Sequence, residues 1–339
     1  MRIAVDAMGG DHAPSEIVKG AVLASREYGL EVVLTGDEDC VGAELKKLGA
    51  AGEVTVVHAP EVISMKEQPA VAVKRKKNSS IVTAVRLVKE GYAKAFVSAG
   101  NTGAAMASAL LELGRIKGID RPAIAVMLPN EKGVTVLIDA GANVDAKPHN
   151  LFQFGIMGYL YAQKILGIPE PRVGLLSNGE EETKGNEVTT AAYPLLAGSG
   201  VNFTGNVEGR HIFSGAVDVV VCDGFVGNIV LKVGEGLAAS MMKMMKEEIT
   251  KSWLAKMGTV MVEPALKVFQ KRVDYSEYGG APLLGVNGIS IICHGRSTAK
   301  AIKNAVRVAR DMVQNELVKA IGESIDGVAG KGVGTRIAR

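Results

Sequence analysis

The chain has 339 residues, 47% of them hydrophobic, which is enough for one large domain or for two halves that share a sheet. Its 39 basic and 36 acidic residues leave a net charge of +3, too small for the broad positive field of a nucleic-acid-binding protein. The three cysteines are scattered and form no CxxC pair, which argues against a zinc ribbon and against a disulfide framework.

Strand and helix patterns alternate through the first third of the chain. The predicted elements are a strand at 2–5, a helix at 14–28, a strand at 31–35, a short helix ending near residue 49, strands at 54–57 and 95–97, and helices at 81–91 and 104–113. Pro14 is typical of a helix start and Gly29 of a helix end. The segment 61–79 shows no clear element and contains the basic run 74–77.

The remaining two thirds continue this alternation with longer helices. Strands at 124–128 and 134–138 flank a short polar turn and predict one antiparallel pair in a mostly parallel sheet. Further strands are expected at 173–175, 217–221 and 289–292, helices at 150–166, 228–252 and 298–321, and an apolar segment that Pro264 breaks and that ends near residue 273. We expect a single domain over 1–325, with a helical segment at about 240–273 projecting from it, and a flexible basic tail over 326–339.

The ends of the chain and its apolar runs predict where the protein works. Met1 leads directly into the first strand, which leaves no room for a signal peptide. No apolar run reaches the length needed to span a bilayer. We therefore expect a soluble, cytoplasmic protein or one that is bound only at a membrane surface.

Six polar, glycine-rich corners each close an apolar strand-like run. They lie at 6–11, 98–103, 139–148, 176–187, 223–228 and 293–297. In an open α/β sheet the carboxyl ends of the parallel strands form a crevice where ligands bind. The pattern predicts an α/β fold with a mostly parallel open sheet, helices on both faces, and an active site built from these corners along one sheet edge.

Standard catalytic and nucleotide motifs are absent from the sequence. There is no GxxxxGK[ST], no HExxH and no GxSxG, and the one string that resembles a dinucleotide fingerprint, 330–334, lacks the strand and helix that should flank it. The chemistry must therefore use glycine loops, carboxylates, amides and a few cations.

Two of the corners have the composition of anion sites. DAMGGD (6–11) and SAGNTG (98–103) place small residues ahead of a helix, where unpaired N–H groups and the positive end of the helix dipole attract anions. An ordinary strand-to-helix turn explains either loop alone equally well. Two such loops at one edge favour a phosphate-like ligand.

Three single residues stand out in the other corners, each with an alternative role. Lys184 lies among Glu180–Glu182, as it would in a solvated surface loop of mutually screened charges. Asn228 is placed to cap a helix, and His294 follows a buried run in which it could simply be hydrogen-bonded.

Seven motifs, in order and at similar spacing over about residues 1–318, resemble the bacterial phosphate acyltransferase family, the acyl-ACP:phosphate acyltransferases of phospholipid synthesis. They are RIAVDAMGGDHAP, VKRKKNSS, SAGNTGA with RIKGIDRPA after it, DAGANVDAKP, GEEETKGNE, DGFVGN and YSEYGGAPLLG. The resemblance implies a fold similar to that of phosphotransacetylases and isocitrate or isopropylmalate dehydrogenases, a homodimer, and no metal or redox cofactor.

The resemblance also implies a reaction and a set of site residues. A long acyl chain would pass from acyl carrier protein to inorganic phosphate, and the acyl phosphate would feed glycerol-3-phosphate acylation, with the glycerol-3-phosphate acyltransferase as a downstream partner. Lys184 and Asn228 would be catalytic, donating to the thioester oxygen as oxyanion donors. The substrate- and phosphate-binding residues would be Asp6, Gly9, Gly10, Ser98, Asn101, Thr102, Asp145, Gly185, Asn186, Asp223 and His294.

Two surfaces are assigned on the same basis. Arg75, Lys76 and Lys77 would receive the acidic carrier protein, although a solvated charged face explains them as well. An apolar stripe with cationic flanks would contact the inner face of the cell membrane, making the enzyme cytoplasmic and peripherally membrane-associated, unless it packs in the dimer or the core. The stripe consists of Ile249, Trp253, Leu254, Met257 and Met261.

Two other functions are kept as alternatives. A metal- and NAD-dependent β-decarboxylating dehydrogenase on the same fold would need clustered carboxylates, for which Asp139, Asp145 and Asp223 are the candidates. A non-catalytic lipid-binding protein would be recruited to membranes through Trp253 and would show no turnover.

Overall fold

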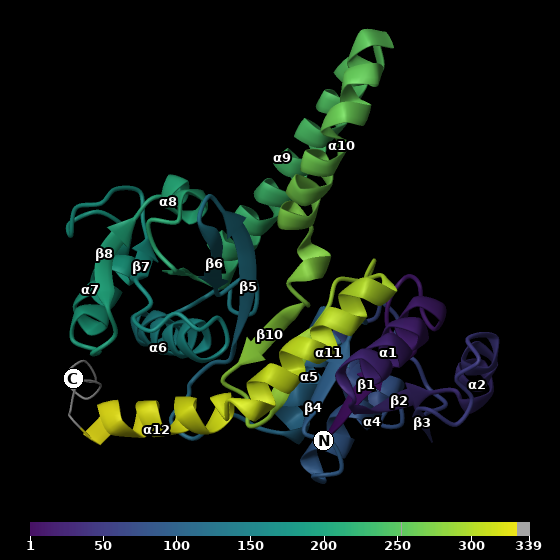
Figure 1. Cartoon of the computed structure of the whole chain (residues 1–339). Coiled ribbons are helices and arrows are strands. Elements are labelled where there is room, and N and C mark those ends of the chain that lie inside the picture. Colours follow the sequence, from purple (N-terminus) through teal and green to yellow (C-terminus); the bar gives the residue numbers. More distant parts are fainter. Residues whose placement is uncertain (252, 331–339) are drawn as a thin grey trace.

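The structure, a computed structural model, describes residues 1–251 and 253–330 (Figure 1). It contains one eleven-stranded sheet in the order β3-β2-β1-β4-β11-β10-β5-β6-β9-β7-β8. The strands are β1 (Arg2–Asp6), β2 (Glu31–Gly36), β3 (Thr55–His58), β4 (Ala95–Ser98), β5 (Ala123–Asn130), β6 (Gly133–Ile138), β7 (Val173–Leu176), β8 (Phe203–Val207), β9 (Val219–Val221), β10 (Ala281–Leu284) and β11 (Ile289–Ile292).

Twelve α-helices are described within the same residues. They are α1 (Ser15–Tyr28), α2 (Glu38–Lys47), α3 (Pro69–Arg75), α4 (Ser80–Lys89), α5 (Thr102–Glu112), α6 (Pro148–Lys164), α7 (Glu187–Ala197), α8 (Gly209–Ser214), α9 (Gly224–Lys251), α10 (Trp253–Val273), α11 (Ala299–Gln314) and α12 (Leu317–Gly330).

The sheet consists of two parallel halves that run in opposite directions. β3, β2, β1, β4 and β11 pair in parallel on one side, and β6, β9, β7 and β8 pair in parallel on the other. Between them β10 pairs antiparallel with both β11 and β5, and β5 pairs antiparallel with β6. These three successive antiparallel pairings reverse the strand direction. The mostly parallel open sheet is confirmed, but the expectation that all six corners share one edge is wrong.

Helices cover both faces of the sheet, as expected. Alternate strand residues point to opposite faces, so Ile3 of β1 is buried with Ile302 of α11, whereas the adjacent Ala4 is buried in another cluster with Val85 of α4. In the other half, residues of α6 and α7 belong to the first cluster, and α8 with the base of α9 forms a third (Figure 1). The sheet is therefore the middle layer of three.

Several elements were not predicted from the sequence: α3, α7, α8, β8 and β10. Each is short or carries a residue that weakens its pattern. α7 contains Pro194, β10 contains Pro282, and β8 contains Gly205 beside a register shift of its pairing with β7. The predicted antiparallel pair is confirmed as β5 and β6.

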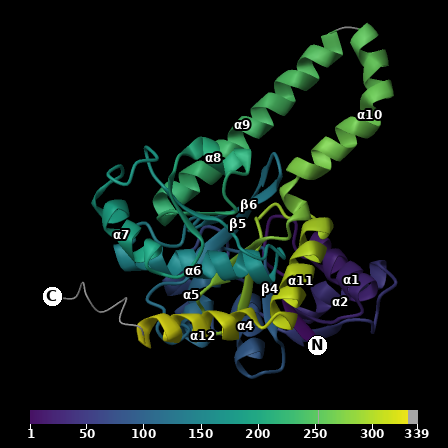
Figure 2. The ribbon, with the colours of Figure 1, turned by 60° about the vertical axis from the view of Figure 1, so that its left-hand side comes forward.

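The helices α9 and α10 form a long hairpin that projects from the body of the protein (Figures 1 and 2). α9 begins at Gly224, so Asn228 lies one turn inside the helix and not at its start. α10 runs unbroken through Pro264, contrary to the expected break. Within the described residues α9 is also the one helix long and apolar enough to cross a membrane, which corrects the expectation that no apolar run reaches that length.

The carboxyl-terminal helix is divided where the sequence predicted continuity. α11 ends at Gln314, Glu316 adopts a left-handed conformation with φ of 49°, and α12 continues to Gly330. α12 therefore extends past residue 326, where we expected a flexible tail to begin. Residues 331–339 of that predicted tail lie outside the described part of the chain.

Candidate active site

The corners after β1, β4 and β11 meet at one end of the first half-sheet and are called here the first corner group (6–11, 98–103 and 293–297). A Cβ added at Gly9 would lie 2.7 Å from the backbone nitrogen of Gly100, and one at Gly10, where φ is +110°, would lie 3.0 Å from the carbonyl oxygen of Gly295. The backbone N–H of Asp11 donates to the same Gly295 oxygen at 2.7 Å. Glycine is required here because three backbones approach one another.

A buried carboxylate ties two of these corners together. Asp6 Oδ2 accepts a 2.7 Å hydrogen bond from the Ser98 hydroxyl, which in turn accepts one from the Gly100 N–H at 3.0 Å. Burial raises the pKa of Asp6, and its hydrogen bonds oppose that shift. Asp6 and Ser98 are both about 1% exposed, so they hold the corner in shape from below and do not face a ligand.

The corners after β6, β9 and β7 form the second corner group (139–148, 223–228 and 176–187). Its center is Asp139, which is fully buried and accepts five hydrogen bonds, from the backbone N–H groups of Ile124, Gly141, Ala142 and Asn143 and from the Asn143 side chain. Burial raises the pKa of Asp139, whereas these donors lower it. The carboxylate therefore fixes the backbone of the corner after β6.

That corner is packed directly against the start of α9. A Cβ added at Gly227 would lie only 1.8 Å from the Asp139 carbonyl oxygen. The next residue is Asn228, whose side chain lies 3.6 Å from the position that a Gly141 Cβ would take. The position of Asn228 is thus set by Asp139 through a contact that only glycine permits. The sequence signal for this was the DGFVGN string, in which the glycine precedes the asparagine.

Asn228 and Lys184 are both exposed, and they follow adjacent parallel strands, β9 and β7. Among the described residues neither side chain has a hydrogen-bonding or ion-pair partner. Glu180, expected to screen Lys184, pairs instead with Arg210 at 2.7 Å. A Cβ added at Gly179 would lie 2.7 Å from Lys184 Cγ, so Gly179 leaves room for the lysine stem. Both donors are free to bind a ligand.

Several of the expected binding residues are instead helix caps. Asn101 Oδ1 accepts from the Ala104 N–H at the start of α5, and its amide nitrogen donates to carbonyl oxygens of the loop before α3. Asn186 caps α7 at the Thr189 N–H, and Asp223 accepts from the Val226 N–H in the first turn of α9. Their side chains shape the corners and are not free to bind substrate.

The other expected binding residues are placed at the surface of the two groups. Thr102, Asp145, Gly185 and His294 are exposed, and Gly185 has a φ of +120°. The His294 Nδ1 accepts a hydrogen bond from the Arg296 N–H at 3.1 Å. Thr102 and His294 belong to the first corner group, and Asp145 and Gly185 to the second.

None of the three cysteines is an activated nucleophile. Burial raises the pKa of Cys293 to about 12 and raises the pKa of Cys222 well above its ordinary value. Cys40 is exposed, and a hydrogen bond to Asp37 raises its pKa as well. Because a thiolate is the reactive form, the site offers no cysteine for a covalent intermediate.

Part of the basic run 74–77 makes contacts within the protein. Lys76 is half-buried, pairs with Glu67 at 2.8 Å and donates to the Val62 carbonyl oxygen. Arg75 pairs with the same carboxylate at 3.0 Å but remains exposed, as does Lys77. Of the three residues expected to contact a carrier protein, Arg75 and Lys77 are therefore accessible, and Lys76 holds the loop before α3.

The carboxylates suggested for a metal do not cluster. The oxygens of Asp139 are occupied by five donors, and Asp223 caps α9. Within the part of the chain that the structure describes, no group of three or more His, Cys, Asp or Glu side chains is arranged to hold a metal ion. The dehydrogenase alternative therefore has no support from these residues.

The chain is similar to known proteins over nearly its whole length. A family model described as fatty acid synthesis protein matches residues 1–320. The chain is 69% identical over 339 residues to the phosphate acyltransferase of Pelotomaculum thermopropionicum, covering 100% of this chain and 99% of that protein. It is 58% identical to the phosphate acyltransferase of Heliobacterium modesticaldum, covering 96% of this chain and 98% of that protein.

Solved structures support the fold. A phosphotransacetylase from Streptococcus pyogenes matches with a TM-score of 0.64 at 19% identity, over 96% of this chain and 94% of that one. The EutD phosphotransacetylase from Staphylococcus aureus matches with a TM-score of 0.63 at 15% identity, over 94% of each chain. From the family model and the close relatives together, the chain belongs to the phosphate acyltransferase family of fatty acid synthesis proteins and is an acyltransferase.

Proposed function

We propose that this enzyme transfers a long-chain acyl group from acyl carrier protein to inorganic phosphate, giving an acyl phosphate for phospholipid synthesis. The observation that carries the proposal is the pair Lys184 and Asn228. They are two exposed hydrogen-bond donors on adjacent strand ends, with no partner among the described residues, while the polar groups around them are engaged in caps and ion pairs.

In the proposed reaction phosphate itself is the nucleophile. The protein therefore needs hydrogen-bond donors for the oxyanion, and it needs no nucleophilic side chain with a base to activate it. A phosphate oxygen attacks the thioester carbon, and the carbonyl oxygen becomes an oxyanion. The Lys184 ammonium and the Asn228 amide donate to that oxyanion. When the tetrahedral intermediate collapses, the carbon–sulfur bond breaks and the carrier thiolate takes up the proton of the attacking hydrogen phosphate. Preorganised donors of this kind each contribute about a hundred- to a thousandfold in rate.

Phosphate is assigned to the first corner group. Among the described residues, the backbone N–H groups of Gly10, Thr102 and Gly103 have no acceptor, and the last two open α5, where the helix dipole favours an anion. The proposal requires that the two corner groups face a common space. In support, Ala140 in the corner after β6 shares a buried cluster with Ile292 at the end of β11 and with Ala104 of α5.

The same proposal includes a carrier-protein landing site at Arg75 and Lys77, with Lys76 beside them. An acidic carrier protein would approach this basic face by charge steering, which raises the association rate and weakens with salt. Reversing Arg75 and Lys77 to glutamate should lower the rate with acyl carrier protein at low salt more than the rate with acyl-CoA. If both substrates are affected equally, the run is only a solvated face.

The hairpin is assigned to dimerisation and to membrane contact. Along α9 the exposed apolar side chains recur every fourth residue, at Phe225, Ile229, Val233, Leu237 and Met241. We assign this stripe to a second copy of the chain, and the hairpin tip to the surface of the membrane. At the tip, Ile249 is half-buried and Met257 is 62% exposed, whereas the side chains of Trp253, Leu254 and Met261 lie outside the described part.

A transfer assay tests the proposed reaction. The protein is mixed with palmitoyl-loaded acyl carrier protein and inorganic phosphate, and free carrier thiol and acyl phosphate are measured together. We expect the two products in equal amounts, with none when phosphate is left out. Thiol release without acyl phosphate would contradict the proposal. Reduction of NAD by a hydroxy acid would instead support the dehydrogenase alternative.

A further inference from the structure

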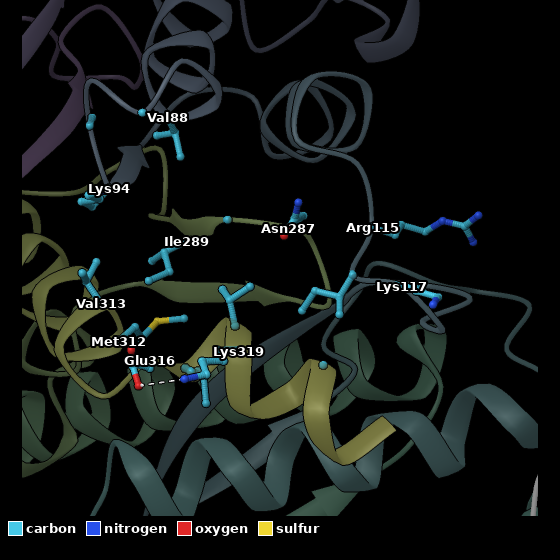
Figure 3. A pocket seen from close by; sticks show the side chains of 17 residues that line it. Val88, Lys94, Arg115, Lys117, Asn287, Ile289, Met312, Val313, Glu316 and Lys319 are labelled. Carbon is cyan, nitrogen blue, oxygen red and sulfur yellow. Dashed lines mark ion pairs between the residues drawn. The ribbon is translucent and has the colours of Figure 1, made fainter. Parts of the chain in front are cut away.

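We propose that the protein has a second ligand site, distinct from both corner groups, that binds a single-chain lipid with a phosphate head. The site is a groove of about 750 Å³ at the amino ends of β4 and β11 (Figure 3). β4 is four residues long, so the groove lies roughly 13 Å from the corner that follows this strand. The proposal goes beyond acyl transfer and does not depend on it.

The floor of the groove is apolar and is formed by two helices and a strand. Met312 and Val313 come from α11, Leu317 and Val318 from α12, and Ile289 from the start of β11. The left-handed turn at Glu316 separates the two helices and directs both toward this floor. A void of about 10 Å³ between α12 and β10 shares Met312, Leu317 and Val318 with the groove and is too small to hold any part of a ligand, so the floor itself is the apolar surface. A hydrocarbon chain therefore finds a continuous apolar surface.

The rim of the groove is positively charged. Lys94 lies at one end, and Arg115 and Lys117 lie at the other (Figure 3). The fourth cation, Lys319, is 3.8 Å from Glu316, the one carboxylate in the lining. Arg115 donates to the Asp120 carbonyl oxygen, whereas the ammonium groups of Lys94 and Lys117 have no acidic partner among the described residues.

The chemistry of this lining selects the class of ligand. The lining carries four cations against one carboxylate, and their positive field favours an anion of more than one charge, such as a phosphate monoester, at either end of the groove. No aromatic side chain lines the groove in the described part of the chain, so it offers nothing on which a nucleotide base would stack. The volume lies within the roughly 300–1,000 Å³ of small-molecule sites. An anionic head on a single hydrocarbon chain satisfies both the floor and the rim.

Dodecyl phosphate is the probe for this site. Its binding to the full-length protein is measured by calorimetry and located by hydrogen–deuterium exchange of backbone amides. We expect protection in segments 115–117, 287–289 and 316–319, which line the groove. Dodecanol has the hydrocarbon chain without the phosphate, and inorganic phosphate has the anion without the chain, so each should bind there at least tenfold more weakly. Dodecanoate, with a single charge, should also bind more weakly than dodecyl phosphate.

Charge reversal separates the groove from the catalytic site. Lys94→Glu combined with Lys117→Glu should lower the affinity at the groove at least tenfold and abolish its protection while leaving the corner groups unaffected. Lys46→Glu, an exposed charge reversal on α2, is the matched control and should change nothing. The inference is overturned if dodecyl phosphate protects only the corner groups, if the double variant keeps full protection of the groove, or if an acidic amphipathic peptide protects it and dodecyl phosphate does not.

Discussion

In the second corner group, single residues fix the positions of their neighbours. Asp139 fixes the backbone of its corner with five accepted hydrogen bonds, and its carbonyl oxygen leaves no room for a side chain at Gly227. Asn228 follows Gly227 and takes its position from this contact. The sequence motifs predicted Lys184 and Asn228 as the donors. They did not decide between a cap and a ligand-binding role for Asn101, which the sequence allowed to cap, and they did not indicate the cap at Asn186, because an asparagine in a glycine loop looks the same in either role.

Gly227→Ala tests how closely Asn228 depends on this contact. A Cβ at this position meets a backbone oxygen that cannot move aside, so the start of α9 must shift. We expect a loss of roughly 1–3 kcal/mol in the free energy of unfolding and a large fall in turnover. Gly42→Ala, in the open middle of α2, is the control and should gain about 0.5–1 kcal/mol. Denaturant unfolding and acyl-phosphate formation are measured on both, and unchanged turnover in Gly227→Ala would contradict this dependence.

Short elements decide the shape of the first corner group. α3 is only seven residues long, and Pro69 at its first position was a start signal that the polar segment 61–79 obscured. Glu67 joins the preceding loop to α3, because it accepts from the Ser64 N–H and pairs with Arg75 and Lys76. The same loop receives the Asn101 amide at the start of α5. Such links between distant segments have no periodicity that a sequence could display.

The pKa of Glu67 makes this link dependent on pH. Its hydrogen bond with Lys76, followed by the one from the Ser64 N–H, lowers the pKa from an ordinary 4.5 to about 2. A lowered pKa in the folded state stabilises the fold above pH 4.5, and that stabilisation is lost as the pH falls toward 2. We expect Glu67→Gln to melt below the wild-type protein at pH 7, with the difference shrinking below pH 4.5. Melting curves that differ equally at pH 7 and pH 3 would show that the ion pairs contribute nothing.

At the scale of the whole molecule, the reversal between the two half-sheets could not be predicted from the sequence. Alternating strands and helices correctly predicted a mostly parallel sheet with helices on both faces. The reversal depends on β10, a four-residue strand from near the end of the chain that inserts between β11 and β5. Strand order is a long-range property, and β10 contains Pro282, so no local pattern revealed it. The sequence analysis expected a projecting helical segment at about 240–273, and this segment lies within the hairpin of α9 and α10.

Two substitutions in the hairpin should separate dimerisation from membrane binding. Leu237 is 59% exposed on the apolar stripe of α9, and Leu237→Glu should convert the proposed dimer to a monomer in sedimentation experiments. Trp253→Glu should leave the dimer intact but abolish co-sedimentation with anionic vesicles, because burial of an aromatic side chain contributes roughly 1.5–3 kcal/mol. Lys232→Ala, a control on α9, should change neither property. A wild-type protein that sediments as a monomer would contradict the dimer assignment, and vesicle binding by Trp253→Glu would contradict the membrane assignment.

The most direct measurement of the central claim is acyl-phosphate formation by Lys184→Ala and Asn228→Ala, compared with Lys46→Ala on α2. All three side chains are exposed, so the fold should be unchanged by circular dichroism and thermal melting. If Lys184 and Asn228 stabilise the oxyanion, each loss should reduce the rate by about a hundred- to a thousandfold, while Lys46→Ala retains full activity. Folded Lys184→Ala and Asn228→Ala variants with nearly normal turnover would contradict the assignment of the reaction to the second corner group.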